Sequence, residues 1–164
     1  LPKDIVIYEI RSVQDDHHAR FDAISRSYEY KVIFGKNPFW QHTAYFFPFE
    51  KHLSIEKMQE AAQLLLAYEA FLPFCKTKSD AKTMICHLTQ SEWQADPVTD
   101  GLTYHVTANR FLRGMIRLIV GMCLNVGVGK VNLEEVRTAL DNQTPLIMSW
   151  SVPPDGLYLK DILY

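Results

Sequence analysis

The chain has 164 residues, of which 48% are hydrophobic and 22% are charged. This composition is typical of a folded globular domain with a hydrophobic core, and it excludes a largely disordered chain. Seventeen basic and nineteen acidic residues give a net charge of −2, so a site that attracts an anion must be a local cluster of basic residues.

The three cysteines, Cys75, Cys86 and Cys123, show no C-x-x-C spacing. Their odd number argues against a disulfide framework and against a structural zinc site, and it favours a reducing cytoplasm. No apolar run reaches the roughly 18 residues of a membrane span, and no signal peptide is recognisable. Because the chain opens at Leu1 without an initiator methionine, we expect it to be a piece of a longer protein.

Alternating apolar and polar residues predict two strands in the first part of the chain, over 5–13 and 19–34. Glycine, asparagine and proline then indicate a turn over 35–40. A helix is predicted over 55–68, because apolar residues recur there at helical spacing after Ser54, a candidate N-cap.

The second half of the chain contains a basic loop or short helix over 71–82 and a predicted hairpin. The strands of this hairpin cover 83–96 and 102–110, with a turn at Asp100 and Gly101. The remaining predicted elements follow in chain order: a helix over 109–121 that ends in the glycine-rich stretch 126–130, a helix over 132–143 capped by Asn132, and a strand over 156–164.

This order of elements predicts an α+β domain, in which helices pack on one face of a largely antiparallel sheet. No internal repeat and no low-complexity linker divides the sequence. We therefore expect residues 1–164 to form a single domain.

The helix predicted from residue 109 has an apolar body but carries Arg110, Arg113 and Arg117. At about 100° per residue these arginines fall within about 60° of one another, with Gly114 and Gly121 on nearly the same side. No acidic residue occurs between positions 101 and 130. The planar guanidinium can bind both phosphate and carboxylate in a bidentate way, so the stripe indicates an anion, either a nucleic acid or an internal carboxylate. A plain solvated face is the alternative.

The strand predicted over 19–34 places Arg20, Arg26, Tyr28 and Tyr30 on one face. Arginines beside tyrosines suit a surface for unstacked bases. The alternative is that both tyrosines are ordinary half-buried residues of a sheet.

Residues that could hold a metal or perform nucleophilic catalysis do not form a recognisable pattern. His17 and His18 are adjacent, so on an extended chain they point to opposite sides and cannot readily chelate one ion. The sequence contains no phosphate loop and no H-E-x-x-H motif.

Several stretches taken together carry a resemblance to one family. They are LPKDI, HHARFDAISRSYEYKV, the MQEAAQLLL helix, NRFLRGMIRLIVG and GLYLKDILY. In this order they closely resemble the bacterial TruA-type tRNA pseudouridine synthases. The resemblance extends over nearly the whole chain, but it corresponds to only the C-terminal half of a typical member.

The resemblance implies an enzyme that isomerises uridine to pseudouridine in the anticodon stem-loop of tRNA, with two similar α+β halves around a central cleft. It also implies a cytoplasmic homodimer that needs no cofactor and no metal. In this family the chemistry begins with an aspartate in a G-R-T-D-x-G-V-H motif, and that motif does not occur here. We therefore expect the catalytic aspartate on an N-terminal domain outside this chain, and the chain alone to be inactive.

The resemblance also implies roles for individual residues. Arg117 corresponds to the arginine that pairs with the nucleophilic aspartate, Tyr28 to the tyrosine that packs against the target base, and Leu157 to an apolar residue of the pocket. Residues expected to contact the RNA are basic: Arg20, Arg26, Arg110, Arg113, Lys76 and Lys78. The stretch 146–152 departs from the small, glycine-containing sequence common in the family.

Two readings without chemistry remain open at the level of the sequence. The chain could be a stand-alone RNA-binding module, in which case its affinity for RNA would fall with salt. It could also be a dimerisation domain whose arginine stripe binds another protein segment.

Overall fold

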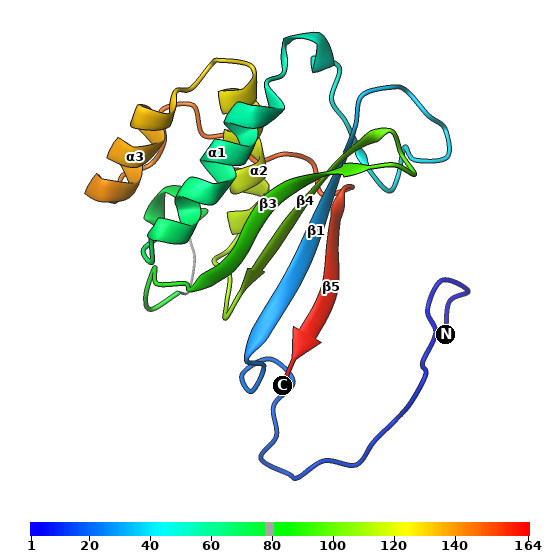
Figure 1. Ribbon diagram of the computed structural model, residues 1–164. Coiled ribbons are helices and arrows are strands. Elements are labelled where there is room, and N and C mark those ends of the chain that lie inside the picture. Colours follow the sequence, from blue (N-terminus) through cyan, green and yellow to red (C-terminus); the bar gives the residue numbers. More distant parts are fainter. Residues whose placement is uncertain (78–80) are drawn as a thin grey trace.

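A mixed five-stranded sheet with three α-helices on one face forms the part of the chain that the structure describes (Figure 1). The structure is a computed structural model, and it describes residues 1–77 and 81–164. The strands are β1 (Ser25–Ile33), β2 (Tyr45–Phe46), β3 (Leu88–Asp96), β4 (Gly101–Ala108) and β5 (Leu157–Leu163). The α-helices are α1 (Ile55–Leu64), α2 (Met115–Gly127) and α3 (Leu133–Asn142).

Strand β1 lies at the centre of the sheet and pairs with three others. It pairs antiparallel with β4 along one side; along the other it pairs first with β5, antiparallel, and then with β2, parallel. Strand β3 completes the sheet beyond β4. The α+β prediction with a largely antiparallel sheet is therefore confirmed, and β2 supplies the single parallel pairing of the described strands.

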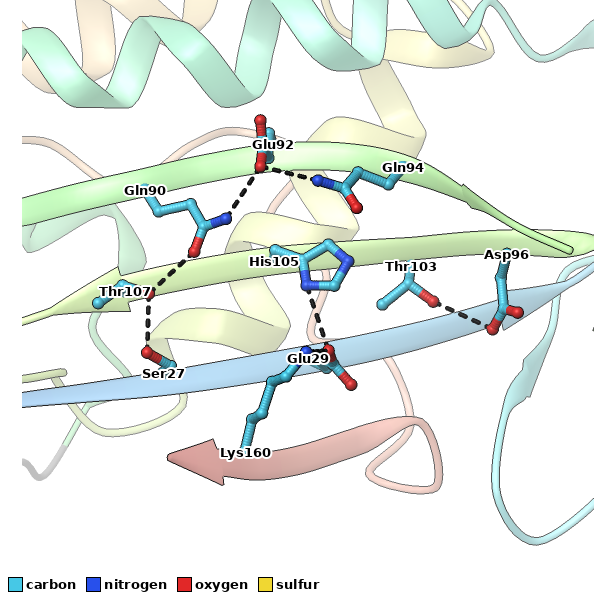
Figure 2. Close-up of polar contacts among 10 residues, drawn as sticks. All are labelled: Ser27, Glu29, Gln90, Glu92, Gln94, Asp96, Thr103, His105, Thr107 and Lys160. Atoms are coloured by element: carbon cyan, nitrogen blue, oxygen red, sulfur yellow. Dashed lines mark hydrogen bonds and ion pairs between the residues drawn. The ribbon is translucent and has the colours of Figure 1, made fainter. Parts of the chain in front are cut away.

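The sheet buries one face against the helices and leaves the other face polar. Tyr30 and Val32 of β1 and Tyr104 of β4 point into the core and are fully buried. Alternate residues of the same strands form the opposite face, which carries hydrogen-bonded polar side chains such as Thr103 and Thr107 (Figure 2). The alternation of a half-buried antiparallel strand accounts for both faces.

Helices α1 and α3 begin at the caps that the sequence indicates. The Ser54 hydroxyl accepts a hydrogen bond from the Lys57 backbone at the start of α1. Asn132 and Glu135 form a reciprocal capping box at the start of α3, which satisfies donors that the helix itself leaves unpaired. Helix α2 is almost wholly buried. No described helix is long and apolar enough to cross a membrane.

The strand predicted over 5–13 is wrong. That segment is extended and exposed, with no strand partner among the described residues, and a strand exists only through its pairing with another. The strand predicted over 19–34 forms only from Ser25 onward, because its first residues make local turns such as the one from the His18 carbonyl to the Phe21 amide. The strand predicted from residue 83 begins at Leu88.

The predicted helical start at residue 109 is also wrong, and this changes the arginine stripe. Asn109 continues the hairpin, since its backbone and side chain both bond the His87 backbone. Gly114 then adopts a left-handed conformation with φ of 73°, which interrupts a helix. Helix α2 begins only at Met115, so Arg110 and Arg113 lie before it and Arg117 alone lies on it.

Candidate functional site

Arg117 lies in the first turn of α2, and its guanidinium is held by the segment that precedes β5. Its Nε donates a hydrogen bond to the Val152 carbonyl at 2.5 Å, and the Val152 amide donates to the Arg117 carbonyl at 3.3 Å. Within residues 1–77 and 81–164, no hydrogen bond or ion pair engages the two terminal nitrogens. The side chain is half-buried, so its direction is fixed while two donors remain available.

Gly121, about one turn further along α2, allows the segment that precedes β5 to approach the helix closely. A Cβ placed on Gly121 would lie 1.9 Å from the Trp150 carbonyl oxygen, far inside any permitted contact. The glycine that the sequence placed on the arginine side of the helix is thus explained by the close approach of another backbone. The stretch 146–152 packs along α2 for this reason.

Tyr30 holds the same segment from the side of the sheet. Its hydroxyl donates to the Pro153 carbonyl at 2.6 Å. Burial raises the pKa of this phenol well above its usual range; nearby Tyr45 adds to the shift and Arg117 opposes it. The hydroxyl therefore stays protonated and remains a donor. Arg117 and Tyr30 together fix two successive carbonyls of the loop.

Tyr28 lies on the central strand β1, and Leu157 lies at the start of β5, directly after the loop that contacts Arg117. Tyr28 is half-buried between Val106 of β4 and Leu159 of β5, and its ring meets Phe111 edge to face at 5.2 Å. Leu157 pairs with Tyr30 at the start of β5. The strand pairing therefore brings the predicted base-contacting tyrosine and the predicted apolar residue to the same face of the sheet.

Two of the predicted RNA-binding residues are adjacent to each other. The Lys76 amide donates to the Arg113 carbonyl at 3.0 Å, and the aliphatic part of Lys76 covers Gly114, where an added Cβ would meet it at 2.8 Å. Arg110 is half-buried just before them. Lys78 lies outside the described residues. The structure thus groups Lys76, Arg110 and Arg113 before the start of α2.

Arg20 and Arg26 lie elsewhere. The Arg26 guanidinium donates to the carbonyls of Ala23, at 3.0 Å, and Asn109, at 2.6 Å, and also contacts that of Arg20. Its charge is thus used to hold the turn before β1 against the end of β4. Arg20 is exposed in that turn, with its guanidinium 5.6 Å from the centre of the Phe21 ring. Neither side chain adjoins Arg117.

A comparison with known protein families identifies the family of this chain. The family described as tRNA pseudouridine synthase matches residues 61–164, a range that contains Arg117, Leu157 and the loop between them. The chain belongs to the tRNA pseudouridine synthase family. The resemblance seen in the sequence motifs is therefore confirmed.

Individual relatives extend the match over the N-terminal residues. The chain is 40% identical to tRNA pseudouridine synthase A of Porphyromonas gingivalis and 39% identical to that of Azobacteroides pseudotrichonymphae; the matches cover 100% of this chain and 64% of each relative. It is 32% identical to the Bacillus subtilis protein of the same name, of which it covers 66%. The chain thus spans about two thirds of the length of these tRNA pseudouridine synthases.

Sequence reasoning missed several groups that lie around Arg117 and Tyr28. Period-two spacing placed Tyr30 on the same face as Tyr28, but did not predict its hydrogen bond to the Pro153 carbonyl. The Val152 and Pro153 carbonyls could not be found from the sequence, because a backbone group carries no residue signature. Phe111 falls within the helix predicted over 109–121, whereas it lies in the segment before α2 and contacts the Tyr28 ring.

Proposed function

We propose that this chain is the C-terminal part of an enzyme that isomerises uridine to pseudouridine in the anticodon stem-loop of tRNA. In this proposal the chain supplies residues that support the reaction, and an aspartate outside the chain supplies the nucleophile. The observation that carries it is the state of Arg117. Its Nε is fixed on the Val152 carbonyl, and its two terminal nitrogens have no hydrogen-bond or ion-pair partner among the described residues. Family membership supplies the reaction class.

Arg117 would hold the absent aspartate ionised and oriented. An opposite charge within hydrogen-bond distance lowers the pKa of a carboxyl group, and a guanidinium with two free nitrogens can bind both carboxylate oxygens. The Val152 hydrogen bond keeps the guanidinium plane in place. The aspartate would therefore remain a carboxylate while it attacks.

Tyr28 and Leu157 would accommodate the target uridine once it is turned out of its stack. The Tyr28 ring is held by its contact with the Phe111 ring at 5.2 Å between centres, so its orientation is fixed for packing against a flat base. Leu157 adds an apolar wall at the start of β5. Lys76, Arg110 and Arg113 would contact phosphates beside this site.

Tritium release tests this assignment, because the hydrogen on C5 of uridine is lost when C5 becomes bonded to the ribose. Full-length protein should release tritium from tRNA labelled at uridine C5. Arg117→Ala should reduce the rate at least about a hundredfold, the usual loss when a preorganised charged donor is removed. Tyr28→Leu should reduce it at least about tenfold through lost stacking. Arg137→Ala, an exposed change on α3, should leave the rate unchanged.

Wild-type rates in the Arg117 and Tyr28 variants would refute these roles. If the isolated chain binds an anticodon arm as tightly as the full-length protein does, a stand-alone RNA-binding module becomes the better description. Absence of tritium release by the full-length protein would refute the enzyme assignment itself.

We further propose that the full-length protein is a cytoplasmic homodimer. The polar face of the sheet supports this, since no described helix covers it and it carries both acidic and basic groups, including Glu29, His105 and Lys160 (Figure 2). A face with both signs of charge can complement itself across a two-fold axis. Sedimentation of the full-length protein with and without tRNA should give the mass of two chains, and a monomer in both would refute the proposal.

A further inference from the structure

A second concave site lies further along α2 than Arg117. It is a cavity of about 520 Å³ between the segment that contains β2, the C-terminal end of α2 and the loop 146–152. Its apolar lining is mostly aromatic. The Trp150 ring lies 5.9 Å from the Tyr45 ring and 6.4 Å from the Phe47 ring, measured between ring centres. Phe49 meets Phe47 edge to face at 5.4 Å and is 54% exposed.

The polar groups of this cavity are basic or neutral. The Lys130 ammonium lies 5.9 Å from the centre of the Phe49 ring, and His52 also lines the cavity. Asn125 of α2 is 7% exposed and donates its amide to the Met148 carbonyl at 3.3 Å. Among the described residues that line the cavity, none is acidic.

This combination fits a nucleotide better than it fits a protein side chain. Aromatic faces bind any unstacked base, at about 1–3 kcal/mol per base. The Lys130 ammonium suits a phosphate, and an amide at the wall suits the hydrogen-bonding edge of a base. The volume lies within the usual range for small-molecule sites. A nucleotide complements the charge of Lys130, whereas an apolar side chain of another protein segment does not.

The cavity shares a loop with the Arg117 site but is distinct from it. Trp150 lines the cavity, whereas Val152, two residues later, holds Arg117. The close contact of the Trp150 carbonyl with Gly121 anchors the loop between the two sites. An RNA strand that places one nucleotide against Arg117 can therefore place a neighbouring one in the cavity.

We propose that this cavity binds one unstacked nucleotide of the tRNA substrate, other than the uridine that reacts. This rests on the proposed function, since it takes tRNA to be the substrate. The base lies among the rings of Trp150, Tyr45 and Phe49, and Lys130 contacts its phosphate.

Binding of substrate tRNA to the full-length protein tests the proposal. Phe49→Leu keeps the apolar volume but removes the exposed ring, and it should raise Kd about tenfold. Lys130→Ala should raise Kd. It should also make the plot of log affinity against log salt concentration less steep, by the amount that corresponds to the loss of about one phosphate contact. Phe39→Leu and Lys57→Ala are matched controls, because both residues are exposed and lie outside the cavity. Both controls should keep Kd within about twofold.

Photocrosslinking identifies the occupant directly. With 4-thiouridine-substituted tRNA, crosslinked peptides should include 45–52 or 146–152, and Phe49→Leu should reduce their yield. Wild-type Kd in both cavity variants would overturn the proposal, and so would crosslinks confined to other peptides. Reduced thermal stability without reduced tRNA affinity in the Phe49 variant would also overturn it, since a protein segment would then be the occupant.

Tritium release separates this proposal from the proposed function. If wild-type protein releases tritium and the cavity variants bind tRNA normally, only the nucleotide site is refuted. If wild-type protein releases no tritium but its tRNA affinity depends on Phe49 and Lys130, only the reaction is refuted.

Discussion

At the residue scale, the absence of a side chain at Gly121 helps to position the Arg117 side chain. The Trp150 carbonyl occupies the space that a Cβ would take. This close approach brings Val152 within hydrogen-bond distance of Arg117. A larger residue at position 121 would push the loop outward and leave the guanidinium without its fixed nitrogen.

Replacement of Gly121 by alanine should therefore destabilise the protein. Overpacking of this kind costs about 1–3 kcal/mol, to be measured as a loss in the free energy of urea unfolding. Gly35→Ala is the matched control, because a Cβ there meets nothing within 4 Å, and it should change stability by less than about 0.5 kcal/mol. Equal stability of the two variants would contradict the close contact.

The three cysteines should differ in reactivity in the folded protein. Burial raises the pKa of Cys123 to about 12 and also raises the pKa of Cys86, so neither forms a thiolate readily. Cys75 is half-buried. At pH 8 a thiol reagent should label Cys75 first, and denaturant should release the other two, as read by mass spectrometry of the labelled peptides. Rapid native labelling of Cys123 would contradict its burial.

The sequence predicted where some candidate site residues lie, but not where all of them lie. Arg117 lies on α2 as expected, because the apolar stretch around it predicted a helix there. Arg110 and Arg113 lie before the helix, because Gly114 adopts a left-handed backbone conformation. A helical-wheel projection assumes a continuous helix and therefore could not predict this interruption. The cavity beside Trp150 was not predicted, since its walls come from three separate segments.

At the element scale, the starts of the two capped helices, α1 and α3, were predicted correctly. Caps and periodicity are local signals, and Ser54 and Asn132 cap α1 and α3 as the sequence indicates. Strand limits depend on partners distant in sequence. Alternation over 5–13 matches a strand, yet no described strand pairs with it, whereas β1 acquires partners on both sides.

The turn that joins β3 to β4 is held by the Asp96 carboxylate. Its Oδ1 accepts hydrogen bonds from the Val98 amide at 3.0 Å and the Thr99 amide at 3.3 Å. Its Oδ2 accepts one from the Thr103 hydroxyl at 3.3 Å (Figure 2). Burial is the largest single influence and opposes ionisation, but the hydrogen bonds from Val98 and Thr99 and the charge of Lys31 together outweigh it and lower the pKa of the carboxyl group.

Asp96→Ala should therefore lower the free energy of unfolding by about 1–2 kcal/mol at pH 7. A carboxyl whose pKa is lower in the folded state stabilises above its unfolded pKa, about 3.9, and loses this effect as pH falls through the folded value. The difference between variant and wild type should shrink in that acidic range. Asp15→Ala, exposed near the N-terminus, should have no effect. A pH-independent difference would contradict the carboxylate's role.

At the scale of the whole molecule, the first 22 residues differ from the rest. They run away from the sheet and make their described hydrogen bonds mostly among themselves (Figure 1). Large apolar side chains there are exposed: Ile5, Val6, Ile7, Tyr8, Ile10, Val13 and Phe21. The hydrophobic core lies between β1, β3, β4 and the helices, so the domain's stability comes from residues 23 onward.

Deletion of residues 1–13 should consequently leave the thermal stability of this chain almost unchanged. Tyr8 is 95% exposed and Ile10 is 87% exposed, so their removal takes almost no buried surface from the fold. The midpoint of thermal unfolding should shift by less than about 2 °C, which corresponds to roughly 0.5 kcal/mol for a domain of this size. Deletion of residues 158–164 is the contrasting change, because it removes most of β5 and its ladder with β1; it should lower the midpoint by many degrees or prevent folding. A large drop on deletion of 1–13 would show that the segment packs on the domain and would overturn this division of the chain.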